Sequence, residues 1–73
     1  MRKPYIIAPE GCRWTAAPAT SPESAYMSIC CFYLPETRIA VIDPDTMKAT
    51  IYTRTLDDNG NLLEINTEEG PRA

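Results

Sequence analysis

Residues 38–66 of this chain read RIAVIDPDTMKATIYTRTLDDNGNLLEIN. Three segments of this stretch are rich in apolar, β-branched and aromatic residues, and clusters of Asp, Asn, Pro and Gly separate them. Residues 38–43 are apolar on both faces, which predicts a central strand. Residues 49–56 and 62–66 predict two further strands. The stretch therefore predicts an antiparallel meander of three strands.

The second turn of this meander fixes a strand register. Asn59-Gly60 is typical of a type I′ turn, which pairs Leu56 with Leu63 and Arg54 with Ile65. The pairing places four apolar side chains on the core face of the sheet: Tyr52, Leu56, Leu63 and Ile65. Arg54 shares that face, and we expect it to lie near the sheet edge with its charged head in water.

An unusual residue follows the first turn of the meander, residues 43–46. A turn of the form Asp-Pro-x-Thr often continues with Gly, which adopts the left-handed conformation, but here the next residue is Met47. Either Met47 has positive φ, at some cost in strain, or the turn differs. We expect a different turn. Met47 and Asp45 are nevertheless candidate contact residues for a partner.

The N-terminal half adds one strand and one helix to the prediction. Residues 4–8 indicate a short strand, and residues 9–21 indicate an irregular loop. Ser21 can cap a helix that begins at Pro22 and continues to about residue 33. Strand is the alternative for residues 29–34, because their side chains favour β structure.

Together these elements predict a small α+β domain. Their order is β-α-β-β-β, with one helix packed on a mainly antiparallel sheet. Residues 1–66 are expected to form this single domain, and residues 67–73 to form a frayed tail.

Composition narrows the possible functions. The chain has 73 residues, seven basic and ten acidic, for a net charge of −3. This sign disfavours direct nucleic-acid binding and suits a partner with a basic surface. Histidine is absent, which excludes Ser-His-Asp and Cys-His catalytic sets within one chain. No signal peptide or apolar stretch of membrane-spanning length is visible, so we expect a cytoplasmic location and no membrane contact.

No cofactor or metal site is expected. The three cysteines, Cys12, Cys30 and Cys31, cannot supply the four ligands of a zinc site. The adjacent pair Cys30-Cys31 is expected to pack as small hydrophobes. Residues 57–61 resemble a calcium loop, but Thr55 and Asn66 occupy the positions where the EF-hand needs Asp and Glu. The chain is therefore not expected to be an enzyme.

Two further segments are candidate partner contacts. The single tryptophan, Trp14, is expected to cap the core; alternatively it is exposed beside Arg13 and anchors a partner. Asp57 and Asp58 form an acidic hairpin tip that a basic surface can recognise.

The leading functional hypothesis is a non-enzymatic protein that docks on a larger host protein or complex. A specific version is a small inhibitor from a phage or mobile element, of the anti-CRISPR or anti-defence type, whose acidic face competes with nucleic acid for a basic groove. A homo-oligomeric interaction module, such as a homodimer, is the alternative. A small-ligand or enzyme site shared between subunits is the third possibility.

Overall fold

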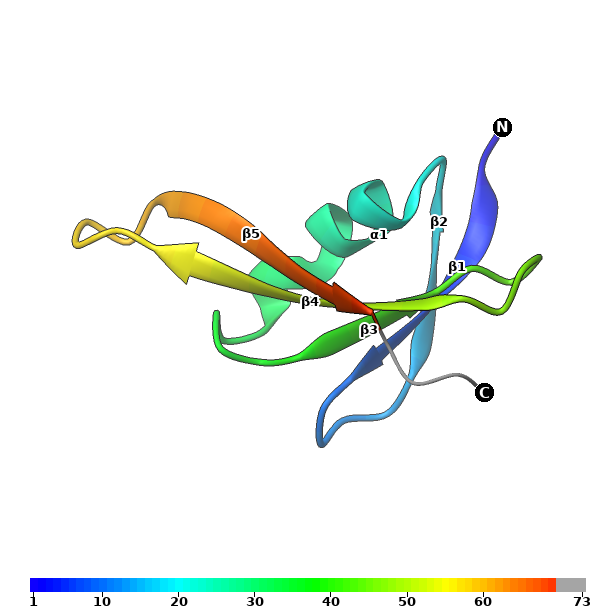
Figure 1. Cartoon of the computed structure of the whole chain (residues 1–73), viewed down its shortest axis with the longest axis horizontal. Coiled ribbons are helices and arrows are strands. Elements are labelled where there is room, and N and C mark those ends of the chain that lie inside the picture. The colour runs from blue at the N-terminus through cyan, green and yellow to red at the C-terminus, as the bar shows by residue number, and fades with distance from the viewer. Residues whose placement is uncertain (70–73) are drawn as a thin grey trace.

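The computed structural model describes residues 1–69, and they form an α+β domain. One α-helix, α1 (Pro22–Ile29), packs on one face of a five-stranded antiparallel sheet of order β2-β1-β3-β4-β5 (Figure 1). The strands are β1 (Lys3–Pro9), β2 (Thr15–Ala19), β3 (Ile39–Ile42), β4 (Ala49–Leu56) and β5 (Leu62–Glu69). The predicted fold class and the central position of β3 are confirmed.

Strand β2 lies inside the segment that the sequence assigned to an irregular loop, and that assignment is wrong for residues 15–19. Its sequence, TAAPA, has low β propensity, so its pairing with β1 rather than its composition makes it a strand. Ala17 and Ala19 are buried, and their small size lets α1 approach this end of the sheet closely. The element order becomes β-β-α-β-β-β.

Helix α1 begins as the sequence predicts. The backbone N–H of Ser24 donates to Oγ of the N-cap Ser21 over 3.2 Å, and Pro22 occupies the first turn. The helix ends at Ile29, before the predicted residue 33, and one 3₁₀ turn, η1 (Cys30–Phe32), follows it. The alternative of a strand over residues 29–34 is wrong.

The core lies between α1 and the sheet. The rings of Tyr26 on α1 and Tyr52 on β4 stack with centroids 4.9 Å apart and an interplanar angle of 15°. The largest fully buried side chains are Tyr26, Ile7, Ile39 and Val41. Each buried strand residue faces α1, so the core occupies one side of the sheet only.

The β4–β5 hairpin departs from its predicted turn. Gly60 has a φ of 84°, but Asn59 does not have positive φ, so the turn is not type I′. The N–H of Gly60 instead donates to the Asp57 carbonyl, as in a type I turn closed by a left-handed glycine.

This turn changes the strand register at the hairpin end. A bulge between Thr55 and Leu56 places Leu56 opposite Leu62 and not opposite Leu63. The predicted pair Arg54 and Ile65 is confirmed. Leu63 is 64% exposed, so its predicted place in the core is wrong.

Three further predictions are corrected. The Arg54 guanidinium does not lie free in water but donates to the backbone carbonyls of Cys30 and Tyr33. Met47 has a φ of 59°, so the chain adopts the left-handed turn that we considered the less favoured alternative. β5 continues to Glu69, beyond Asn66, where the last strand was predicted to end. Residues 70–73 of the predicted tail 67–73 lie outside the described residues.

Candidate functional site

The six candidate contact residues are not brought together. Asp57 and Asp58 lie in the β4–β5 hairpin turn at one end of the long axis, and Asp45 and Met47 lie in the β3–β4 turn at the other end (Figure 1). Residues 13–14 lie in a third place, the connection between β1 and β2. The molecule is 38 Å long, so these segments cannot form one small site.

Trp14 is 68% exposed, and its predicted role as a cap of the core is wrong. Arg13 beside it is exposed as well. The tryptophan follows a turn in which the N–H of Cys12 donates to the Pro9 carbonyl, and it precedes the first residue of β2. Its use as a partner anchor remains a prediction.

Asp45 belongs to an intramolecular cluster of charged side chains. The Lys3 ammonium lies 2.9 Å from the Asp43 carboxylate and 3.0 Å from that of Asp45, and it is 5.3 Å from the centroid of the Tyr5 ring. Hydrogen bonding to Asp43, then to Asp45, raises the pKa of Lys3, and the same ammonium lowers the pKa of Asp43. This cluster ties the start of β1 to the β3–β4 turn.

At the hairpin tip, Asp57 also forms intramolecular hydrogen bonds. Its Oδ1 atom accepts hydrogen bonds of 2.9 Å from the backbone N–H groups of Asn59 and Asn61. The carboxylate therefore fixes the turn, whereas the exposed Asp58 has no such bond among the described residues.

The cysteines divide by burial. Cys30 is buried in the core as predicted, whereas Cys31 is exposed, so the packing prediction is wrong for Cys31; Cys12 is exposed as well. Residues 1–69 contain no group of three or more Cys, Asp or Glu side chains arranged to hold a metal ion. Within the same residues, no helix is long and apolar enough to cross a membrane.

The most distinctive surface is the face of the sheet opposite α1, which we call the open face. The strand pairings place nine apolar side chains on it: Pro4, Ile6, Ala8, Ala16, Pro18, Ala40, Ile42, Ala49 and Ile51. All nine are half-buried or exposed, and no described element covers them. The sequence signalled this surface only in part, through the apolar residues on both faces of residues 38–43.

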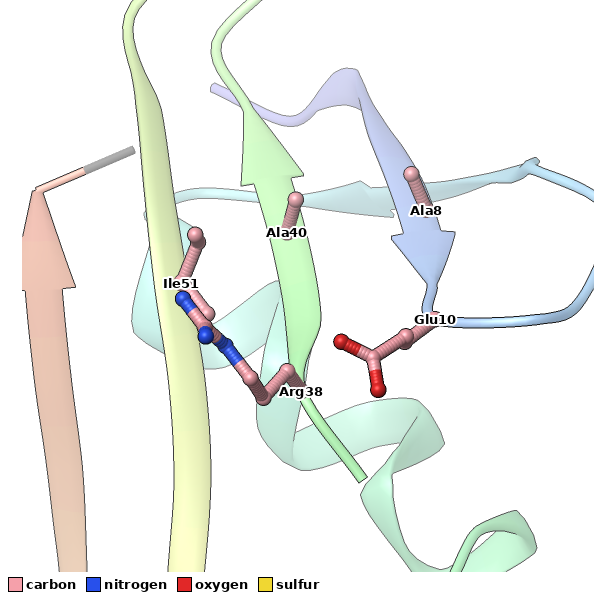
Figure 2. Close-up of a pocket in the computed structure, with 5 residues that line it drawn as sticks. All are labelled: Ala8, Glu10, Arg38, Ala40 and Ile51. Carbon is pink, nitrogen blue, oxygen red and sulfur yellow. The ribbon is translucent and has the colours of Figure 1, made fainter. Parts of the chain in front are cut away.

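A shallow depression of about 380 Å³ lies on the open face, lined by Ala8, Glu10, Arg38, Ala40 and Ile51. In Figure 2, the Arg38 side chain reaches across toward Ile51, and the Glu10 carboxylate lies on the other side of β3. Arg38 also forms an ion pair with Glu68 of β5. The floor is therefore apolar, and the charged groups stand at its edge.

Chemically, this arrangement suits contact with an apolar surface more than catalysis. Of the residues that line the depression, only Glu10 and Arg38 are charged, and the Arg38 guanidinium is already paired with a carboxylate. A reaction site needs several polar groups that converge on one point. No protein-family model, curated protein or solved structure matches this chain.

Proposed function

We propose that the protein is a cytoplasmic, non-enzymatic module that docks on a larger protein through the open face. The observation that supports this proposal is the set of nine apolar side chains on a sheet face that none of the described elements covers. An antiparallel sheet with one face in water normally carries polar side chains on that face. A contiguous apolar patch of this kind is typical of a protein–protein contact.

The side chains of the open face are suited to close packing. Four of the nine are alanines, at positions 8, 16, 40 and 49, and three isoleucines, Ile6, Ile42 and Ile51, stand among them. Alternation of small and large residues gives a relief into which a second surface can interlock at interior density. Such packing contributes roughly 25 cal/mol for each Å² of apolar area removed from water.

Charge indicates what kind of protein the partner is. Glu10 and Glu68 stand at the edge of the apolar patch, where Arg38 pairs with Glu68, and the net charge of the chain is −3. A partner with an apolar patch surrounded by Lys and Arg complements this surface, and opposite potentials accelerate the encounter. Blocking a basic groove of a host protein, as an inhibitor from a phage or mobile element does, is one specific form of this function.

A homodimer through the same face is the second candidate. A two-fold axis through Ala40 brings the apolar patches of two sheets together, an arrangement that β-sandwiches use within one chain. Sedimentation over a concentration series distinguishes the two, because a strict monomer excludes the homodimer.

The test of open-face docking compares two variants as baits in host lysate. Ile51→Lys places a charge in the lining of the depression on the open face, and Met27→Lys places the same charge on the exposed side of α1. We expect one protein to be captured by the wild type and by Met27→Lys but not by Ile51→Lys. Added salt should weaken this capture. Equal capture by both variants, with equal thermal stability, would contradict the proposal.

A further inference from the structure

The two edges of the sheet differ in how well they are protected. β2 and β5 are the edge strands, and a free strand edge presents unpaired N–H and C=O groups to any extended chain. β2 has five residues, contains Pro18 and packs against α1. β5 has eight residues, contains no proline, and is exposed at every position except Ile65.

The direction of the backbone groups follows from alternation along each strand. The N–H of Arg54 donates to the Pro35 carbonyl over 3.2 Å, so the even-numbered residues of β4 direct their backbone groups away from β5. The odd-numbered residues of β4 therefore bond to β5, where their partners are Glu64, Asn66 and Glu68. The backbone groups of Leu63, Ile65 and Thr67 consequently point outward at the free edge.

By the same alternation, the edge of β2 presents fewer outward backbone N–H groups to an added strand. The N–H of Glu10 donates to the Arg38 carbonyl, so the even-numbered residues of β1 bond toward β3 and the odd-numbered ones toward β2. Pro18 of β2 lies opposite Pro4 and directs its nitrogen outward, where it has no hydrogen to donate. Among the described residues, β5 is the edge that is ready for strand addition.

The side chains of β5 define the chemistry of the added strand. Glu64, Asn66 and Glu68 project from the open face, whereas Leu63, Ile65 and Thr67 project toward the side of α1. An added strand places its residues beside these two rows, because cross-strand neighbours share a face. One row is acidic, and the other is largely apolar.

A second copy of β5 does not fit this edge well. Each copy brings three glutamates, Glu64, Glu68 and Glu69, and no basic residue. Like charges on paired strands are destabilising. An edge with this charge is complementary to a basic strand and repels its own copy.

We propose that β5 accepts, by strand addition, an extended segment of a partner protein in which basic and apolar residues alternate. Backbone hydrogen bonds to Leu63, Ile65 and Thr67 hold the segment. Its basic side chains lie beside Glu64 and beside Glu68, whose carboxylate also pairs with Arg38. This inference rests on the proposed function and names the partner's binding element. Its contact surface, however, is the β5 edge and not the apolar patch.

The probes are synthetic peptides of about eight residues, the length of a typical strand. One alternates Lys and Val, and a second replaces each Lys with Glu. Two more carry N-methyl groups on the Lys-Val peptide, at every Val or at every Lys. A strand directs alternate N–H groups to opposite sides, so only one of these two methylated peptides keeps the groups that bond to β5.

We expect the Lys-Val peptide to slow amide hydrogen exchange at Leu63, Ile65 and Thr67, and the Glu-Val peptide to leave it unchanged. One methylated peptide binds roughly tenfold or more weakly than the other, because it loses several backbone hydrogen bonds. In the protein, Thr67→Pro removes one outward N–H and weakens binding, whereas Thr67→Val keeps it. Circular dichroism checks that both variants are folded.

Two results would overturn strand addition at β5. One is equal binding by both methylated peptides, because charge attraction alone then accounts for the affinity. The other is the absence of exchange protection at the three outward amides. Neither result touches open-face docking, which the Ile51→Lys bait tests separately and without these peptides.

Discussion

Nη2 of Arg54, on strand β4, lies 2.9 Å from the backbone carbonyl oxygen of Tyr33, which follows the 3₁₀ turn η1. The same guanidinium donates to the Cys30 carbonyl. A charged side chain from the sheet thus satisfies carbonyl groups where the helical segment ends. This contact holds the chain between α1 and β3 against the core side of β4.

Replacement of Arg54 should destabilise the protein more than replacement of a free surface arginine. Arg54→Met keeps the apolar stem but leaves the Cys30 and Tyr33 carbonyls without this donor. Hydrogen bonds from a charged group contribute about 1.5–3 kcal/mol, and we expect a loss of that size in the free energy of unfolding. Urea denaturation measures it. Arg13→Met is the control, and an equal change in both variants would contradict the role.

Replacement of Tyr26 by Phe should stabilise the protein. Oη of Tyr26 is buried and has no hydrogen-bond partner of good geometry within residues 1–69. Burial raises the pKa of this phenol, and the nearby Arg54 guanidinium opposes part of that rise. Tyr26→Phe removes the unpaired hydroxyl and keeps the ring that stacks on Tyr52. We expect a gain of about 1 kcal/mol in thermal or urea unfolding, and Tyr52→Phe should gain less. A loss of stability in Tyr26→Phe would show that the hydroxyl is bonded in solution.

Glycine at position 47 should also stabilise the fold. Met47 holds a φ of 59°, a conformation that disfavours residues with a Cβ atom by about 1–2 kcal/mol. Glycine removes this penalty but has more backbone entropy to lose, so the net gain expected for Met47→Gly is up to about 1 kcal/mol. Met47→Ala keeps a Cβ atom and serves as the control. If alanine stabilised the protein as much as glycine, relief of backbone strain would not be the cause.

The contribution of the Lys3 cluster to folding stability should depend on pH. Lys3 lowers the pKa of Asp43, so this pair stabilises the folded state above the ordinary aspartate pKa of about 4 and ceases to do so as the pH falls below it. In Lys3→Met, carboxyl NMR titration should give Asp43 a pKa closer to its ordinary value. Arg13→Met should leave the pKa of Asp43 unchanged. An Asp43 pKa that does not respond to Lys3→Met would contradict the ion pair.

The sequence predicted the fold where local signals were strong. The Ser21 cap, the proline after it and the alternation along residues 38–66 placed α1, β3, β4 and most of β5. It did not predict β2, because alanine and proline carry no strand preference and only pairing with β1 orders them. The predicted hairpin register is wrong at Leu63 because Asp57 accepts hydrogen bonds from two backbone N–H groups and selects a longer turn.

The candidate site was less accessible to sequence reasoning. The sequence predicted partner contacts at charged and aromatic loop residues, yet Asp45 and Asp57 form intramolecular contacts. The apolar patch of the open face combines residues from four strands, and only the sheet order assembles them. A missed strand therefore also hid part of the site, since Ala16 and Pro18 belong to β2.

Photo-crosslinking from a single position of the open face tests the central claim most directly. A photoreactive amino acid replaces Ile51, which lines the depression on the open face, and the same amino acid replaces Met27 on α1 in a control. After irradiation in host cells, we predict that position 51 crosslinks to one larger protein through a region rich in Lys and Arg, and that position 27 does not. Crosslinks only to a second copy of the chain, or equal crosslinks from both positions, would contradict docking on a larger partner through this face.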